Sequence, residues 1–225
     1  MTFSIAARCE RTGMFGIAVS SSSPCVAARC AHVRAGVGAV ATQNITDPSL
    51  GPLGLDLLAS GLSANEAMEM LRAEARHVDY RQLALIDSEG RAASWSGDKT
   101  LGLYRSAAET NAVAAGNLLA NGDVPKLMLE AFAASPELHI GDRLIRAMAA
   151  AVEAGGEEGP VHSAGMLIAD KVSWPIADLR IDWHDTDPIG ALAGLWMLWK
   201  PQASDYVTRA LEPSTAPAYG VPGDL

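Results

Sequence analysis

The sequence has little positive charge and no long apolar run. Its 225 residues include 17 lysines and arginines against 26 aspartates and glutamates, a formal net charge of -9. Nucleic acids and anionic membrane surfaces are bound by basic patches, so we expect neither as a partner. No apolar stretch approaches the roughly 20 residues that span a bilayer, and no signal peptide is visible at the amino terminus. We therefore expect a cytoplasmic protein.

Cysteines are also few. Cys9, Cys25 and Cys30 form an odd set without the CxxC spacing of zinc or redox sites. We interpret them as three buried, reduced thiols, and we expect neither a metal nor any other cofactor.

The patterning of the chain predicts a single domain with antiparallel sheets. Hydrophobic residues make up 49% of the sequence, and short strand-like runs are joined in pairs by tight turns. A capping box at Ser63 and Glu66 and an N-cap at Asp187 mark two helix starts. We expect an α+β domain over residues 1–200 and an extended tail over 201–225. The expected strands are 2–9, 15–21, 37–42, 83–87, 92–96, 111–115, 163–169 and 176–181, and the expected helices are 49–59, 64–75, 124–134, 140–154 and 188–200.

The beginning of the chain carries its strongest chemical signal. Thr2 follows the initiator methionine and opens the first expected strand. Cells commonly remove an initiator methionine that precedes a small residue, and removal here leaves Thr2 with a free α-amine beside its own hydroxyl. A model α-amine titrates at roughly 7.7–8.0, so it is a competent base near neutral pH. This pairing predicts an N-terminal-nucleophile (Ntn) amide hydrolase.

Several segments of the sequence resemble one family, domain of unknown function 1028. The likeness runs from Thr2 to about Leu198 and is most specific at the amino terminus. The resemblance implies the four-layer αββα sandwich of Ntn hydrolases, with two largely antiparallel sheets, and it implies no established activity. The matching segments are TFSIAAR (2–8), TG (12–13), GIAV (16–19), AGVGAVATQ (35–43), GP (51–52), GL (54–55), GNLL (116–119), SAGML (163–167) and DLRID (178–182) with His184.

Polar residues at strand ends complete the predicted site. We assign catalysis to Thr2 and Asn117, because an amide side chain at a strand end can donate to a tetrahedral oxyanion. The substrate is expected to be a small amide or peptide-like molecule, and the protein a homo-oligomer. The residues assigned to substrate binding are Ser20, Ser22, Arg34, Gln43 and Asn44.

Two alternatives remain open at this point. The lysine–aspartate pair that proteasome-like enzymes place near the nucleophile has no counterpart where the second strand ends, which favours a non-catalytic Ntn-like metabolite-binding or scaffold protein. The weaker alternative is a metal-dependent hydrolase at Asp182, His184 and Asp187, because imidazole and carboxylates are suitable ligands.

Overall fold

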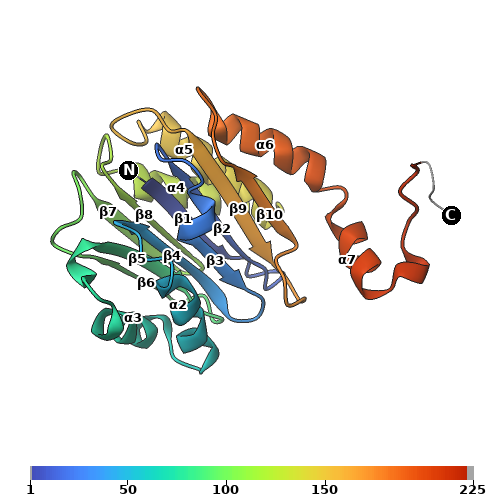
Figure 1. Cartoon of the computed structure of the whole chain (residues 1–225), viewed down its shortest axis with the longest axis horizontal. Helices are drawn as coiled ribbons and strands as arrows, with labels where there is room; N and C mark the ends of the chain where they lie inside the picture. Colours follow the sequence, from blue (N-terminus) through green and yellow to red (C-terminus); the bar gives the residue numbers. More distant parts are fainter. Residues whose placement is uncertain (1, 222–225) are drawn as a thin grey trace.

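A computed structural model describes residues 2–221 of the chain. These residues form ten strands in two sheets, and every pairing between the strands is antiparallel. Helices lie on the outer faces of both sheets (Figure 1). The α+β fold class expected from the sequence is therefore confirmed.

The larger sheet has six strands, and its central pair includes the first strand of the chain. This position buries the first strand from both sides, because a neighbouring strand pairs with each of its edges. In spatial order the strands are β10 (Ala177–Ile181), β9 (Ser163–Ala169), β2 (Phe15–Ser21), β1 (Thr2–Arg8), β8 (Ala112–Asn117) and β7 (Arg105–Glu109).

The smaller sheet has four strands that follow one another in sequence order. The strands are β3 (Ala31–Arg34), β4 (Gly38–Asn44), β5 (Arg81–Ile86) and β6 (Ala92–Ser96).

Most of the helices divide between the two outer faces, whereas α1 packs in the cluster between the sheets. Figure 1 shows α2 and α3 beside the smaller sheet, and α6 and α7 leading away from the edge of the larger one. The helices are α1 (Ala27–Cys30), α2 (Leu50–Ala59), α3 (Ala64–Glu74), α4 (Val124–Ala133), α5 (Ile140–Glu153), α6 (Pro188–Trp199) and α7 (Ala203–Leu211), with 3₁₀ turns at η1 (Val78–Tyr80) and η2 (Pro213–Thr215).

Three hydrophobic clusters hold the four layers together. Alternation along β1 sends Phe3 and Ile5 to one face, where they pack with helices α4 and α5, and sends Ala6 to the other face. The Ala6 cluster lies between the two sheets, and Leu71 of α3 belongs to the third cluster, outside the smaller sheet. The αββα order of layers therefore follows from which face of each strand is apolar.

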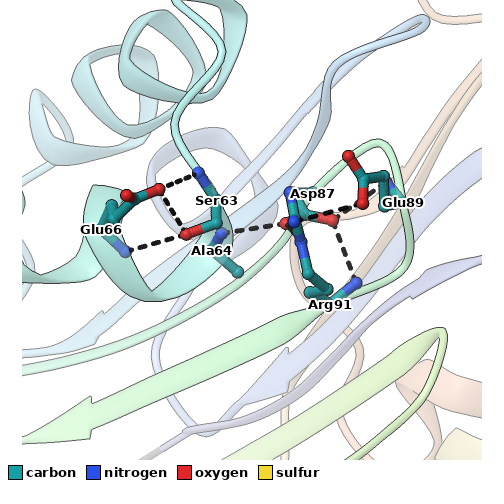
Figure 2. Close-up of polar contacts among 6 residues, drawn as sticks. All are labelled: Ser63, Ala64, Glu66, Asp87, Glu89 and Arg91. Atoms are coloured by element: carbon teal, nitrogen blue, oxygen red, sulfur yellow. Dashed lines mark hydrogen bonds and ion pairs between the residues drawn. The ribbon is translucent and has the colours of Figure 1, made fainter.

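A buried carboxylate ties the start of α3 to the turn between β5 and β6. The capping box predicted from the sequence is confirmed, with Ser63 Oγ accepting from the Glu66 amide and the Glu66 carboxylate accepting from the Ser63 amide. Next to it, Asp87 Oδ2 accepts from the Ala64 amide at 2.9 Å and from Arg91 Nε at 2.7 Å (Figure 2). Asp87 is 2% exposed. The same buried carboxylate therefore accepts hydrogen bonds both from the start of α3 and from the turn between β5 and β6.

Three expectations need correction. The tail after Pro201 is not simply extended, because residues 203–211 form α7, an amphipathic helix in which no side chain is buried. Strands β3 and β7 were not expected, since both are short and more exposed than a core strand. Cys9 and Cys30 are buried thiols as expected, whereas Cys25 is exposed.

Candidate functional site

Thr2 lies at the first position of β1, in the middle of the larger sheet. It stands directly opposite Asn117 of β8, and the pairing of Phe3 with Ser20 brings Ser21 of β2 to its other side. The Thr2 side chain is 5% exposed, and its hydroxyl donates to Ser21 Oγ at 3.4 Å. The residue predicted to be the nucleophile is thus held between two polar neighbours on adjacent strands.

The serines at the end of β2 divide between the two faces of the sheet. Ser21 Oγ also lies 2.9 Å from Ser23 Oγ, which accepts a hydrogen bond from Arg29. Ser20, which was assigned to substrate binding, points to the opposite face and donates to the Ser163 carbonyl at 2.9 Å. The structure therefore brings Ser21 to Thr2, where the sequence suggested Ser20 and Ser22.

A buried network of hydrogen bonds links the two sheets beneath Thr2. Ser4 lies two residues along β1 on the same face as Thr2, and its hydroxyl donates to Gln43 Oε1 at 2.7 Å. Gln43 Nε2 donates to Gln82 Oε1 at 2.8 Å, and Asn117 Nδ2 donates to the same oxygen at 3.0 Å. All four side chains are at most 1% exposed, so this network fixes the orientation of Asn117 beside Thr2.

Asn117 has an acceptor that the network does not use. Within residues 2–221 its Oδ1 is buried and has no hydrogen-bond partner. A buried polar atom left without a partner costs roughly 1–3 kcal/mol, so a functional role is a natural explanation for it. The position of Asn117 opposite Thr2 places this oxygen next to the start of β1.

Glu157 is the residue that the sequence analysis missed. It pairs with Leu119 just beyond the end of β8, is 4% exposed, and accepts from the Ser22 amide through Oε2 at 3.3 Å. Its Oε1 is buried and finds no partner in the described part of the chain. Burial raises the pKa of the Glu157 carboxyl to about 7. A buried carboxyl with a pKa near neutrality is typical of functional sites.

Two other residues assigned to substrate binding lie in structural roles. Arg34 sits at the turn end of β3, opposite Gly38, and forms a 2.9 Å ion pair with Asp56 of α2. Asn44 has a left-handed backbone with φ of 72°, and its side chain bonds the Tyr80 carbonyl and the Leu101 amide. Asn44 thus connects three loops. Arg34 lies opposite Gly38, the first residue of β4, whereas Gln43 is near the other end of that strand.

The segment around His184 forms a helix cap. His184 Nδ1 accepts from the Asp187 amide at 2.9 Å, and Asp187 Oδ1 accepts from the Gly190 amide at 2.7 Å, as the predicted N-cap of α6. Across residues 2–221 no group of three or more histidine, cysteine, aspartate or glutamate side chains is arranged to hold a metal ion. The same residues contain no helix with the length and apolar character needed to cross a membrane.

A cavity lies at the far end of β1. Its volume is about 860 Å³, and Arg8, Cys9 and Arg143 are among its lining residues. A smaller cavity of about 380 Å³ lies between α4 and α5. Neither of these two cavities is lined by Thr2.

A comparison with known protein families tests the family resemblance seen in the sequence. The model of DUF1028, a family of unknown function, matches residues 2–192. The chain belongs to the DUF1028 family. A crystal structure of the DUF1028 protein SPO2555 from Silicibacter pomeroyi is 33% identical, with a TM-score of 0.83 and 93% of each chain covered. The resemblance drawn from the sequence is therefore confirmed.

Two more distant structural matches are Anbu proteins. Anbu (ancestral beta-subunit) from Yersinia bercovieri is 14% identical with a TM-score of 0.37, over 92% of this chain and 97% of that one. The Gly-1 mutant of Anbu from Hyphomicrobium sp. strain MC1 is 12% identical with a TM-score of 0.42, over 92% and 99%. Both TM-scores are too low to carry any conclusion about activity. No curated protein matches this DUF1028 chain.

Proposed function

We propose that the form of this chain that begins at Thr2 is an N-terminal-nucleophile amidohydrolase for a small amide or peptide-like substrate. The observation that carries the proposal is the pair of buried oxygens near the start of β1, Asn117 Oδ1 and Glu157 Oε1, which lack hydrogen-bond donors within residues 2–221. Removing Met1 creates an α-ammonium group at Thr2 with three N–H donors. Removal of Met1 would therefore place a new ammonium group at the end of β1 where two buried oxygens lack a hydrogen-bond donor in residues 2–221.

The proposed reaction uses Thr2 as both nucleophile and base. The hydroxyl oxygen attacks the substrate carbonyl carbon while the neutral α-amine takes the hydroxyl proton. The proton then passes to the departing amine, the amide C–N bond breaks, and an acyl-threonine ester remains. Water attacks this ester, releases the acid and restores the hydroxyl. Backbone amides and the second N–H of Asn117 Nδ2 hold the oxyanion in both steps.

Glu157 has a supporting electrostatic role in this proposal. When the Thr2 amine takes a proton it becomes a cation, and a carboxylate close by stabilises that cation. Burial raises the pKa of Glu157 to about 7, so about half of the carboxyl groups are ionised at pH 7. In this proposal the ionised form is the one that stabilises the protonated amine.

The test starts from purified protein whose mass shows that Met1 has been removed. Wild type, Thr2→Ala and Thr2→Ser are compared on a panel of N-acyl amino acids and dipeptide amides, with products identified by mass spectrometry. All three have a small second residue, so their methionine is removed alike. We expect Thr2→Ala to lose at least about a thousandfold in turnover and Thr2→Ser to retain part of it. Equal turnover by Thr2→Ala overturns the proposal.

A second candidate function is a non-catalytic Ntn-like protein that binds a metabolite or serves as an oligomeric scaffold. The cavity at the far end of β1 supports the binding function, because its roughly 860 Å³ falls in the range of small-molecule sites. Met197 and Leu198 support the scaffold, since they are 76% and 69% exposed on α6. A processed wild-type chain that hydrolyses no member of the amide panel favours this second function.

A further inference from the structure

The cavity at the far end of β1 contains a buried guanidinium group that has no carboxylate within 4.0 Å among residues 2–221. Arg143 of α5 lines it and is 8% exposed. Its guanidinium stacks on the Phe132 ring at 3.8 Å, and its Nε donates to the Phe132 carbonyl at 2.9 Å. Both of these partners are electrically neutral, and the Cys9 side chain also hydrogen-bonds to the guanidinium. Burial acts to raise the pKa of the Cys9 thiol, but hydrogen bonds from Thr12 and Arg11 outweigh it and lower that pKa. Burying a cation without a carboxylate beside it is costly, so a negative group from outside the chain stabilises this position.

Two further guanidinium groups face the same space. Arg8 donates to Asn111 Oδ1 at 3.2 Å and Arg11 to the Glu137 carbonyl at 2.9 Å, again both neutral acceptors. Among residues 2–221, none of the three arginines has a carboxylate oxygen within 4.0 Å. Three arginines without a carboxylate partner in the described part of the chain are notable at a net charge of -9.

The acidic residues of the cavity lie at its rim. Glu10, Glu109, Glu130 and Glu137 line it, and all four are exposed to solvent, where their charges are screened. Lys126 lies 3.6 Å from Glu130 and offsets part of that charge. The buried charge of the cavity is therefore positive, whereas both acidic and basic side chains lie around its opening.

Apolar side chains supply the rest of the wall. Leu129 and Phe132 of α4 are buried residues that line the cavity, as does Ala112 at the start of β8. Ligand pockets of this size are typically apolar with a few polar groups that fix orientation. The cavity thus suits a molecule with one anionic end and a short apolar body.

We propose that this cavity binds a small carboxylic acid with an apolar body, with its carboxylate on Arg143 and its apolar part against Leu129 and Phe132. Arginine is suited to this role because its planar fork matches a carboxylate in a bidentate pair. Arg8 and Arg11 add attraction at the entrance. The site does not depend on the chemistry at Thr2, since the seven residues of β1 separate the two by about 20 Å.

The test is calorimetric titration of the full chain at pH 7.5 with phenylacetate, with benzyl alcohol as the neutral match and inorganic phosphate as an anion lacking the apolar part. We expect phenylacetate to bind at least about tenfold more tightly than either of the others. Arg143→Gln should weaken phenylacetate about 30-fold or more, whereas Arg146→Gln should leave it unchanged. Arg146 lies on the same helix, is exposed, donates to Ser135 Oγ and does not line the cavity.

Because Arg143 is buried, its variant must first show wild-type circular dichroism. If Arg143→Gln does not fold, the exposed Arg11→Gln replaces it, and we expect phenylacetate affinity to fall about threefold to fivefold. Absence of phenylacetate binding at millimolar concentration overturns the proposal. Equal affinity for phenylacetate in wild type and in the folded arginine variant overturns it as well, and so does tighter binding of phosphate than of phenylacetate.

Discussion

At the scale of single residues, several polar side chains are buried together near the start of β1. Thr2, Asn117 and Glu157 are each at most 5% exposed, yet two of them carry an oxygen without a partner in the described structure. Polar atoms in such surroundings lower the stability of the fold. This cost at one end of the central strand is the observation on which the proposed site at Thr2 rests.

Glu157 gives the first prediction at this scale. Its folded pKa of about 7 lies above the ordinary glutamate value of 4.5, so between those pH values the folded state holds a proton that the unfolded state has released. The free energy of unfolding therefore falls as pH rises from about 4.5 to about 7, in total by about 3 kcal/mol. Glu157→Gln removes this dependence, and we expect the variant to be more stable than wild type at pH 8.

The measurement is chemical denaturation of both proteins at pH 5 and pH 8. At each pH the free energy of unfolding of the variant is subtracted from that of wild type, and the change in this difference between the two pH values reports Glu157 separately from other titrating groups. Glu158→Gln is the matched control, because Glu158 is adjacent in sequence and exposed. A Glu157→Gln variant whose stability relative to wild type stays constant from pH 5 to pH 8 contradicts the raised pKa.

At the scale of elements, much of the secondary structure could be predicted from local signals. The capping box at Ser63 and the N-cap at Asp187 located helix starts to the residue, because each requires a particular side chain at a particular position. Tight turns and alternation located the strands at 92–96 and 163–169 with the observed bounds. The four-layer arrangement came from the family resemblance.

The missed parts depend on contacts distant in sequence. The expected strand 83–87 left out Gln82, which lies in β5. The role of Gln82 depends on the packing of β5 against β8, where Gln82 Nε2 donates to the Gly116 carbonyl at 3.0 Å. Ser20 and Ser21 are adjacent, so choosing the face that meets Thr2 required the register of β1 with β2. Glu157 follows two glycines in a loop, and no local pattern marks it as buried.

Asp87 gives a prediction at the scale of elements. It joins α3 to the turn between β5 and β6, so Asp87→Asn should destabilise both together (Figure 2). An amide has one oxygen in place of two, and the charge that holds Arg91 is lost. We expect the free energy of unfolding to fall by about 3 kcal/mol, measured by urea denaturation, with the exposed Asp98→Asn as control.

The pH dependence of Asp87 has a definite sign. Burial raises the pKa of Asp87, but hydrogen bonds from Arg91, Ala64 and Glu89 outweigh burial and leave this pKa below the ordinary aspartate value of 3.8. The stability that Asp87 contributes is thus present above about pH 4 and lost as pH falls through the lower folded pKa. Equal acid sensitivity in wild type and Asp87→Asn contradicts this account.

At the scale of the whole molecule, three clusters of buried side chains bind four layers, and α7 lies outside all of them. The helix is attached through Trp199, which stacks on Tyr206 with ring centroids 4.9 Å apart. Trp199 is itself anchored, since its Nε1 donates to the Ile176 carbonyl at 2.9 Å. The division into a domain over 1–200 and a separate tail stays a prediction.

Removing residues 201–225 tests that division. Since α7 buries no side chain, we expect the free energy of unfolding to change by less than about 1 kcal/mol, measured by urea denaturation of the full and shortened chains. Light scattering on both reports whether either forms the expected homo-oligomer. A loss of more than about 2 kcal/mol shows that the tail is part of the folded domain.

The central place of β1 has a practical consequence for anyone producing this protein. A purification tag fused ahead of Thr2 turns its amine into a peptide nitrogen and extends a strand that already pairs on both edges. Under the proposed mechanism, an assay on such a fusion would detect no amide hydrolysis even if the processed chain is active. Affinity handles belong at the opposite terminus, beyond a helix that buries none of its side chains.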